Sequence, residues 1–275
     1  MADPLPPIFL ATAIEAVVRA GEIQLAGFGT GIRIDKKGAI DLVTEIDLRI
    51  EREFRAMIAD RFSGHAVLGE EFEAAGDRDA ASRYCWVFDP VDGTTNYAHG
   101  LPIFCASLAL EIDGDLAVGA VYDPTRRELF TAERGHGAWL NGQPLRVSAV
   151  DALLDSLLVT GFHYGIQRDP EELVGLFREF LTRARAVRRL GSAALDLCYV
   201  AAGRFDGYWE SKIQPWDVAA GALIVAEAGG QVRTVAGGPF RSRAGSVLAT
   251  NGLIHGAMLE VMAEYAASRS PKGTP

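Results

Sequence analysis

The chain has 275 residues, of which 49% are hydrophobic and 23% charged, so it can bury a sizeable core and is not a disordered polypeptide. Its net charge of −9 disfavours nucleic acid or an anionic membrane as the main partner, and its three cysteines form no Cys-x-x-Cys pair for zinc or redox chemistry. The N-terminus has no basic leader and no uncharged apolar run reaches membrane-spanning length, so we expect a cytoplasmic protein without a membrane partner.

Hydrophobic periodicity predicts two helices at the start of the chain. Apolar residues repeat at intervals of three and four over residues 8–27, and again from Thr44 until Ser63-Gly64 ends the pattern. Apolar runs at 66–71 and 84–90 then predict two short buried strands. Both runs end in acidic residues, and strand ends are where binding sites usually lie.

An antiparallel meander is expected next. Three strand-like runs at 104–112, 116–123 and 128–133 are separated by turn-forming residues. The Asn141-Gly142 pair between apolar flanks predicts a hairpin.

The second half alternates strand and helix patterns, which is typical of an α/β layer. Strands are expected at 156–160, 186–190, 205–210, 231–235 and 246–250, and helices at 170–184, 192–202, 216–228 and 253–267. We place the boundary between an N-terminal α+β half (1–150) and a C-terminal α/β half (151–275) near Val150. No Pro-, Gly- or Ser-rich linker marks it, so the halves should pack as one compact unit.

The segment DPVDGTTN, residues 89–96, directly follows an apolar strand run. Its two aspartates and the Val91 carbonyl are hard oxygen ligands, the kind that Mg2+ prefers. Gly93 lets the backbone approach a ligand closely, and the amides of Gly93 and Thr94 can begin a short helix that attracts phosphate. An ordinary acidic turn is the alternative, because Asp-Gly pairs are common in loops.

Four more carboxylate residues lie in or next to other predicted strands and helices. Glu70 ends the preceding strand and can complete a metal shell, while Asp41 and Asp47 flank the start of the second helix. If Asp47 meets Thr94, the pair can orient a metal-bound water. Asp217 opens the helix expected at 216–228 and can bring a ligand from the second half. Each has an alternative role as a surface charge or a helix cap.

Candidate substrate contacts lie in the second half. Ser192 and Ala193 begin a helix with small residues, which suits close approach of a polyol phosphate, although capping by Ser192 explains the pattern equally well. Glu210 is a candidate for bonding substrate hydroxyl groups, or else a charge on an edge strand. His163 is either a substrate contact or a solvated loop residue.

These residues belong to a series of motifs by which the chain resembles the inositol monophosphatases, especially their bacterial members. The motifs are DLVTEID, GEE, WVFDPVDGTTNYAHG, GAVYDP, GAWLNG, TGF, RRLGSAALDLCYVAAGRFDGYWE and PWDVAAGALIVAEAGG. The resemblance implies a layered α/β fold of the sugar-phosphatase type and a homodimer. It also implies Mg2+-dependent, Li+-inhibited hydrolysis of small phosphomonoesters.

Applied residue by residue, the resemblance implies a site with two or three Mg2+ ions. Glu70, Asp89 and the Val91 carbonyl would hold the first ion, and Asp89, Asp92 and Asp217 the second. Asp47, Glu70 and Thr94 would be the catalytic residues. Substrate contacts would come from Asp92, Gly93, Thr94, Thr95, Arg188, Ser192, Ala193, Glu210 and Asp217. For Arg188, a surface or interface position is the alternative, and Lys36 resembles the family's lysine on the first loop.

The resemblance does not choose the substrate. Inositol monophosphate is the expected one, but the same scaffold also hydrolyses fructose 1,6-bisphosphate, histidinol phosphate and 3'-phosphoadenosine 5'-phosphate. A function of a different class is that of an accessory protein for RNA polymerase and ribosomal-RNA processing. Arginines between 178 and 189 would provide its surface, although a solvated face or dimer contacts explain them as well.

Overall fold

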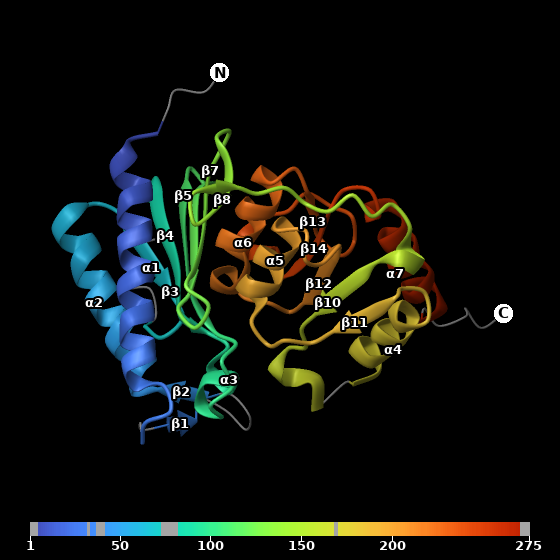
Figure 1. Ribbon diagram of the computed structural model, residues 1–275, viewed down its shortest axis with the longest axis horizontal. Coiled ribbons are helices and arrows are strands. Elements are labelled where there is room, and N and C mark those ends of the chain that lie inside the picture. The colour runs from blue at the N-terminus through green and yellow to red at the C-terminus, as the bar shows by residue number, and fades with distance from the viewer. Residues whose placement is uncertain (1–4, 32–33, 37–41, 73–81, 168–169, 270–275) are drawn as a thin grey trace.

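The computed structural model describes residues 5–31, 34–36, 42–72, 82–167 and 170–269 (Figure 1). Helices α1 (Pro7–Gly27) and α2 (Glu45–Arg61) form the first layer. A small antiparallel sheet of β1 (Ile34–Lys36) and β2 (Leu42–Thr44) lies between them in sequence. Both predicted helices are confirmed. The small sheet was not predicted, because strands of three residues are too short to show a hydrophobic period.

A seven-stranded sheet follows α2, and its spatial order is the order of its strands in the sequence. The strands are β3 (Ala66–Gly69), β4 (Tyr84–Asp92), β5 (Cys105–Ile112), β6 (Asp115–Asp123), β7 (Glu128–Glu133), β8 (Gly137–Leu140) and β9 (Gln143–Pro144). All pairs are antiparallel except β3 with β4, so the predicted meander is confirmed. Asn141 and Gly142 join β8 to β9 with φ of 49° and 77°, as the predicted hairpin requires.

The second half forms a five-stranded sheet of order β11-β10-β12-β14-β13. Its strands are β10 (Leu157–Thr160), β11 (Ala186–Arg188), β12 (Gly207–Ser211), β13 (Gln231–Arg233) and β14 (Ser246–Thr250). Strand β10 runs parallel to β11 and β12, whereas β14 is antiparallel to both of its neighbours. The helices of this half are α4 (Pro170–Leu181), α5 (Ala193–Ala201), α6 (Pro215–Glu227) and α7 (His255–Arg269), with 3-10 turns η1 (Leu153–Asp155), η2 (Tyr164–Gln167) and η3 (Ser242–Ala244). In the first half, the short helix α3 (Thr94–Ala98) lies between β4 and β5 in the sequence.

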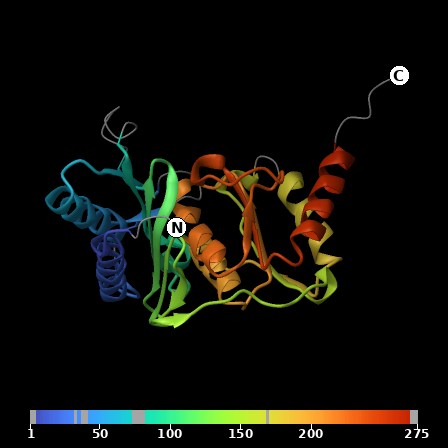
Figure 2. The same cartoon turned by 90° about the horizontal axis from the view of Figure 1, so that it is seen from above.

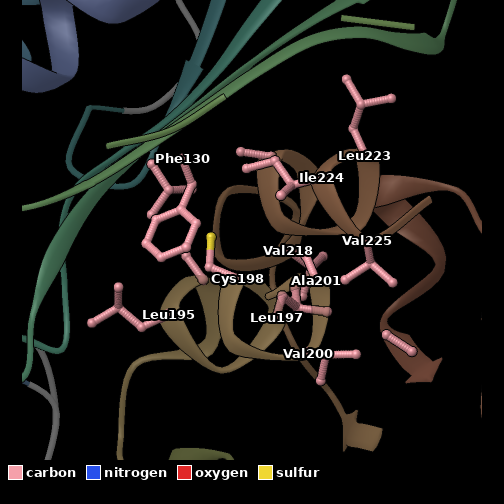
Figure 3. Packing of buried hydrophobic residues seen from close by; sticks show 14 of the residues in the cluster. Phe130, Leu195, Leu197, Cys198, Val200, Ala201, Val218, Leu223, Ile224 and Val225 are labelled. Carbon is pink, nitrogen blue, oxygen red and sulfur yellow. The ribbon is translucent and has the colours of Figure 1, made fainter. Parts of the chain in front are cut away.

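Five layers result, and Figure 2 shows them in succession as helices, sheet, helices, sheet, helices. Helices α5 and α6 lie between the two sheets, and their residues are buried nearly all round. In Figure 3, Phe130 from β7 faces Leu195 and Cys198 of α5. One hydrophobic cluster therefore joins both halves, and the predicted layered α/β fold is confirmed. Val150, where we placed the boundary, lies in the connection between the two sheets.

No helix in the described part of the chain is long and apolar enough to cross a membrane.

Candidate active site

The DPVDGTTN segment forms the end of β4 and the start of α3. The pairing of β4 with β5 shifts register between Asp89 and Asp92, which forms a bulge around Pro90, a residue without an amide hydrogen. Within the bulge, the Val91 amide donates to Asp89 Oδ1 at 2.9 Å, and the Thr94 hydroxyl donates to the Val91 carbonyl at 2.9 Å. The irregularity brings both aspartates to one pocket.

Gly93 makes the turn from β4 into α3. Its φ is 100°, in the left-handed region, and a Cβ atom there would lie 2.8 Å from the carbonyl oxygen of Ile103. The short helix expected at Thr94 is present as α3. A side chain at residue 93 would therefore both strain the backbone and collide with the neighbouring chain.

The pocket encloses about 640 Å3 and is lined by both halves of the chain. It gathers eleven of the predicted site residues, namely Glu70, Asp89, Val91, Asp92, Gly93, Thr94, Thr95, Ser192, Ala193, Glu210 and Asp217. His163 lines it too, and its Nδ1 accepts the Gly165 amide at 2.9 Å. Of the loop candidates, Asp41 lies outside the described residues, and for Lys36 only the main chain, in β1, is described.

Asp47 and Asp217 occupy equivalent positions in the first turns of α2 and α6. Asp47 accepts the amide of Thr44 at 3.0 Å, and Asp217 accepts the amide of Gln214 at 2.9 Å. Both are thus helix caps, the alternative considered from sequence. Asp47 nevertheless also reaches Thr94, with 3.4 Å between Oδ1 and the threonine hydroxyl, from behind the pocket wall.

Burial of carboxylates beside one another dominates the electrostatics of this region. Burial raises the pKa of Asp89 well above its ordinary range, and the charges of Glu70, Asp92 and Asp217 raise it further. Burial likewise raises the pKa of Asp92 and of Asp47 to about 6. The pKa of Asp217 is also raised, first by burial and then by Asp92 and Glu70.

Such a concentration of hard oxygen donors fits a divalent cation, which favours the ionised form of each carboxylate. Within the described part of the chain, no three histidine, cysteine, aspartate or glutamate side chains are gathered tightly enough to hold a metal ion as they stand. The carboxylates share a pocket and influence one another's charge without forming a closed cage. A bound cation would have to draw them together.

Asp92 links the two halves of the chain. It accepts the hydroxyl of Ser192 at 2.6 Å, the amide of Ala194 at 2.7 Å and that of Ala193 at 3.3 Å. Ser192 itself makes no side-chain cap, so the capping role considered for it is wrong. The cap of α5 is supplied instead by Asp92, a residue 100 positions earlier. Only the packed halves bring this aspartate to the helix end.

Glu210 forms part of the opposite wall. Its side chain is 8% exposed, and the Tyr208 hydroxyl donates to Oε2 at 2.6 Å. Burial raises the pKa of Glu210 to about 7. Gly161 makes room for this carboxylate, because a Cβ atom there would lie 1.8 Å from Oε2.

The arginine expected on the substrate side was Arg188, the first of an adjacent pair. Arg188 is exposed on β11 and does not line the pocket, whereas Arg189 does. Arg189 lies over the ring of Phe162 and donates to its carbonyl at 3.4 Å. Consecutive residues at a strand end point in opposite directions, so a shift of one position changes the face.

Two buried polar residues support the carboxylate loops and were not predicted. Glu51, four residues after Asp47 on α2, accepts the amides of Glu71 at 2.7 Å and Phe72 at 3.2 Å, next to Glu70. Gln24 of α1 donates to the Pro90 carbonyl at 2.7 Å. A polar residue on the apolar face of a predicted helix was the available signal for both.

Comparison with known proteins agrees with this geometry. The model of the inositol monophosphatase family matches residues 8–270. The chain belongs to the inositol monophosphatase family. It is 43% identical over 272 residues to an inositol-1-monophosphatase of Synechocystis, covering 96% of this chain and 94% of that one. It is also 41% identical to the Nus factor SuhB of Pseudomonas aeruginosa, with 87% and 90% covered.

Solved structures of family members have the same architecture. The inositol monophosphatase from Anabaena superposes with a TM-score of 0.84 at 40% identity, covering 94% of this chain and 96% of that one. Family members are metal-dependent phosphatases that act on small phosphomonoesters, and this protein is a phosphatase.

Proposed function

We propose that the protein hydrolyses inositol monophosphate to inositol and phosphate with the help of Mg2+. The observation that carries the proposal is the meeting of Glu70, Asp89, Asp92 and Asp217 in one pocket that also holds Glu210. The first four residues offer the anionic oxygen atoms that Mg2+ requires, and the fifth offers an acceptor for hydroxyl groups.

Glu70, Asp89 and the Val91 carbonyl would hold one Mg2+ ion, and Asp89, Asp92 and Asp217 a second, with a third ion near Glu70. Bound Mg2+ supplies an activated water and stabilises negative charge on the phosphoryl oxygens. The amides of Gly93 and Thr94 would hold phosphate. Thr94, backed by Asp47 at 3.4 Å, would orient the water for attack in line with the departing alcohol.

The alcohol part of the substrate would lie against the second half of the chain. Ser192, Ala193 and Glu210 line that side of the pocket, with Thr95 of α3 also in the lining, while Ser192 keeps Asp92 in place through its hydroxyl. The name of the Synechocystis relative supports inositol 1-phosphate. Fructose 1,6-bisphosphate, histidinol phosphate and 3'-phosphoadenosine 5'-phosphate are the alternatives that the experiment must separate.

Phosphate release from these four compounds, measured with and without Mg2+ and Li+, tests the proposal. We expect release that requires Mg2+, is inhibited by Li+ and is fastest for inositol 1-phosphate. If another of these compounds is hydrolysed fastest, that compound replaces inositol 1-phosphate as the proposed substrate, and the proposed Mg2+-dependent reaction is unchanged. Absence of release from all four with Mg2+ present would refute the enzyme function proposed here.

We also propose a cytoplasmic homodimer. Light scattering after size-exclusion chromatography should give about twice the monomer mass of 29.5 kDa. A monomer at micromolar concentration would contradict the dimer without affecting the catalytic proposal.

The arginine surface gives little support to a nucleic-acid or polymerase-binding role. Arg178 and Arg183 pair with Glu179, and Arg185 pairs with Asp155 at 2.8 Å, so much of its positive charge is neutralised. The relative named Nus factor SuhB is the reason to test it. Loss of polymerase binding in Arg183→Glu with intact phosphatase activity would establish that second role.

A further inference from the structure

Asp196 is a buried carboxyl group in the pocket for which the catalytic scheme has no use. It lies in the first turn of α5, and its amide donates to the carbonyl of Ser192 at 2.9 Å. Its side chain is only 1% exposed, yet it borders the same cavity as Asp92 and Glu210. Its Oδ1 atom has no hydrogen-bond partner in the described part of the chain.

An unpartnered polar atom in a folded interior is costly, and native proteins rarely keep one without a ligand or a water to satisfy it. Another buried aspartate, Asp206, is bonded at both of its carboxylate oxygens. It accepts the Ser148 hydroxyl at 2.5 Å and the Leu157 amide at 2.7 Å. Asp196 differs from Asp206 because it borders a cavity, so the missing partner can enter from the pocket.

The surroundings of Asp196 favour a neutral carboxyl group. Burial raises the pKa of Asp196 well above its ordinary range, and the charges of Asp92 and Glu210 raise it further, against a smaller opposing effect of Arg189. A neutral carboxyl group both donates and accepts a hydrogen bond. A hydroxyl group does the same, so the two can form a reciprocal pair, whereas an amine or a second phosphate would not match as well.

We propose that Asp196 is a specificity-determining residue that bonds a hydroxyl group of the alcohol part of the substrate, beside Glu210. The inference rests on the proposed function, because it assumes that a polyol phosphate occupies this pocket. It adds to that function a hydrogen bond to the alcohol part of the substrate from the first turn of α5. This is the helix whose N-terminal end is capped by Asp92.

Steady-state kinetics of Asp196→Ala and Asp196→Asn on two substrates test the proposal. Inositol 1-phosphate carries hydroxyl groups, and p-nitrophenyl phosphate carries none. For Asp196→Ala we expect kcat/KM on inositol 1-phosphate to fall about tenfold, mainly through KM, with p-nitrophenyl phosphate changed by less than about twofold. Asp196→Asn retains a donor and an acceptor and should recover most of the loss.

Cys198→Ala is the matched control, since Cys198 is buried on the same helix and does not line the pocket. It should leave the ratio of the two kcat/KM values unchanged even if it lowers the melting temperature. Equal losses on both substrates in Asp196→Ala, or no loss on either, would overturn the role of Asp196. Failure of the wild-type protein to hydrolyse either substrate would instead refute the proposed function, and this inference with it.

Discussion

The two walls of the pocket differ in how their polar groups are satisfied. On the wall built by β3, β4 and the start of α6, burial raises the pKa of Asp89 and of Asp217, and the charge of Glu70 raises both further. On the wall built by β12, Glu210 is held by the Tyr208 hydroxyl at 2.6 Å. Under the proposed function, the first wall would hold Mg2+ and the second would bond hydroxyl groups of the substrate. We therefore expect reaction chemistry and substrate choice to depend on different walls of the pocket.

The largest effect is expected from Asp217→Asn, which removes a charge from the first wall. Turnover should fall at least about 10³-fold on every substrate, because a metal ligand serves the reaction whatever the alcohol is. The metal-free variant should melt at a higher temperature than the wild type, since repulsion among buried carboxylates is relieved. Turnover assays and thermal melts with EDTA measure both effects.

Asp155→Asn is the matched control for that variant, because Asp155 is exposed and pairs with Arg185 away from the pocket. It should change neither turnover nor the metal-free melting temperature beyond a degree or so. Unchanged turnover in Asp217→Asn would contradict the proposal that two Mg2+ ions take part in the reaction.

A smaller effect is expected from Asp47→Asn, behind the first wall. We expect kcat to fall about 10²-fold with little change in KM, because Asp47 acts on Thr94 and not on the bound substrate. The capping bond from the Thr44 amide can persist with asparagine, so stability should be nearly kept. Losses from Asp47→Asn and Thr94→Val should not multiply in the double variant if the two residues act as a unit.

Glu210→Gln probes the second wall and should be selective. We expect kcat/KM to fall about tenfold for inositol 1-phosphate and to stay close to wild type for p-nitrophenyl phosphate. An equal fall in kcat/KM on both substrates would contradict the proposed division of roles between the two walls.

The stability of the Glu210→Gln variant, relative to wild type, should depend on pH. The pKa of Glu210 is raised from 4.5 to about 7, so the folded protein holds this proton over that window and loses stability as the pH rises through it. Glutamine cannot ionise, and the metal-free Glu210→Gln protein should gain a few degrees in melting temperature over wild type at pH 8 but little at pH 5. Neighbouring Tyr208, Arg189 and Asp92 remain in both proteins, so their effects largely cancel.

The smallest effect is expected from Gln24→Leu, which removes the hydrogen bond from α1 to the Pro90 carbonyl. Loss of one buried hydrogen bond corresponds to a change of about two- to tenfold, which should appear as a weaker apparent affinity for Mg2+. Turnover at saturating Mg2+ should recover, as expected for a residue that positions the ligand loop. A fall in turnover that Mg2+ does not restore would contradict this assignment.

Much of the fold followed from local patterns. The helical period located α1 and α2, the meander followed from three apolar runs, and Asn141-Gly142 fixed a hairpin because both residues accept positive φ. Errors were confined to ends and to short elements. The helix expected over 170–184 ends at Leu181, and strands of three residues such as β1 and β2 show no period.

The candidate site divides along the same line. Motifs next to one strand, such as DPVDGTTN, identified the carboxylates of the first wall because those residues are close in sequence and share one bulge. The second wall depends on strand direction and helix packing. That is why Arg188 was chosen where Arg189 lines the pocket, and why Asp196 went unnoticed.

The sequence by itself determined the element order, the family resemblance and the residues able to bind metal, since each rests on residue type and short spacing. Only the tertiary structure decided which of these groups meet. It placed Asp92 as the cap of α5 across 100 residues and bonded Glu51 to the main chain next to Glu70. It also left the Oδ1 atom of Asp196 without a hydrogen-bond partner among the described residues. Contacts between distant segments depend on how the layers pack, and no local pattern encodes that packing.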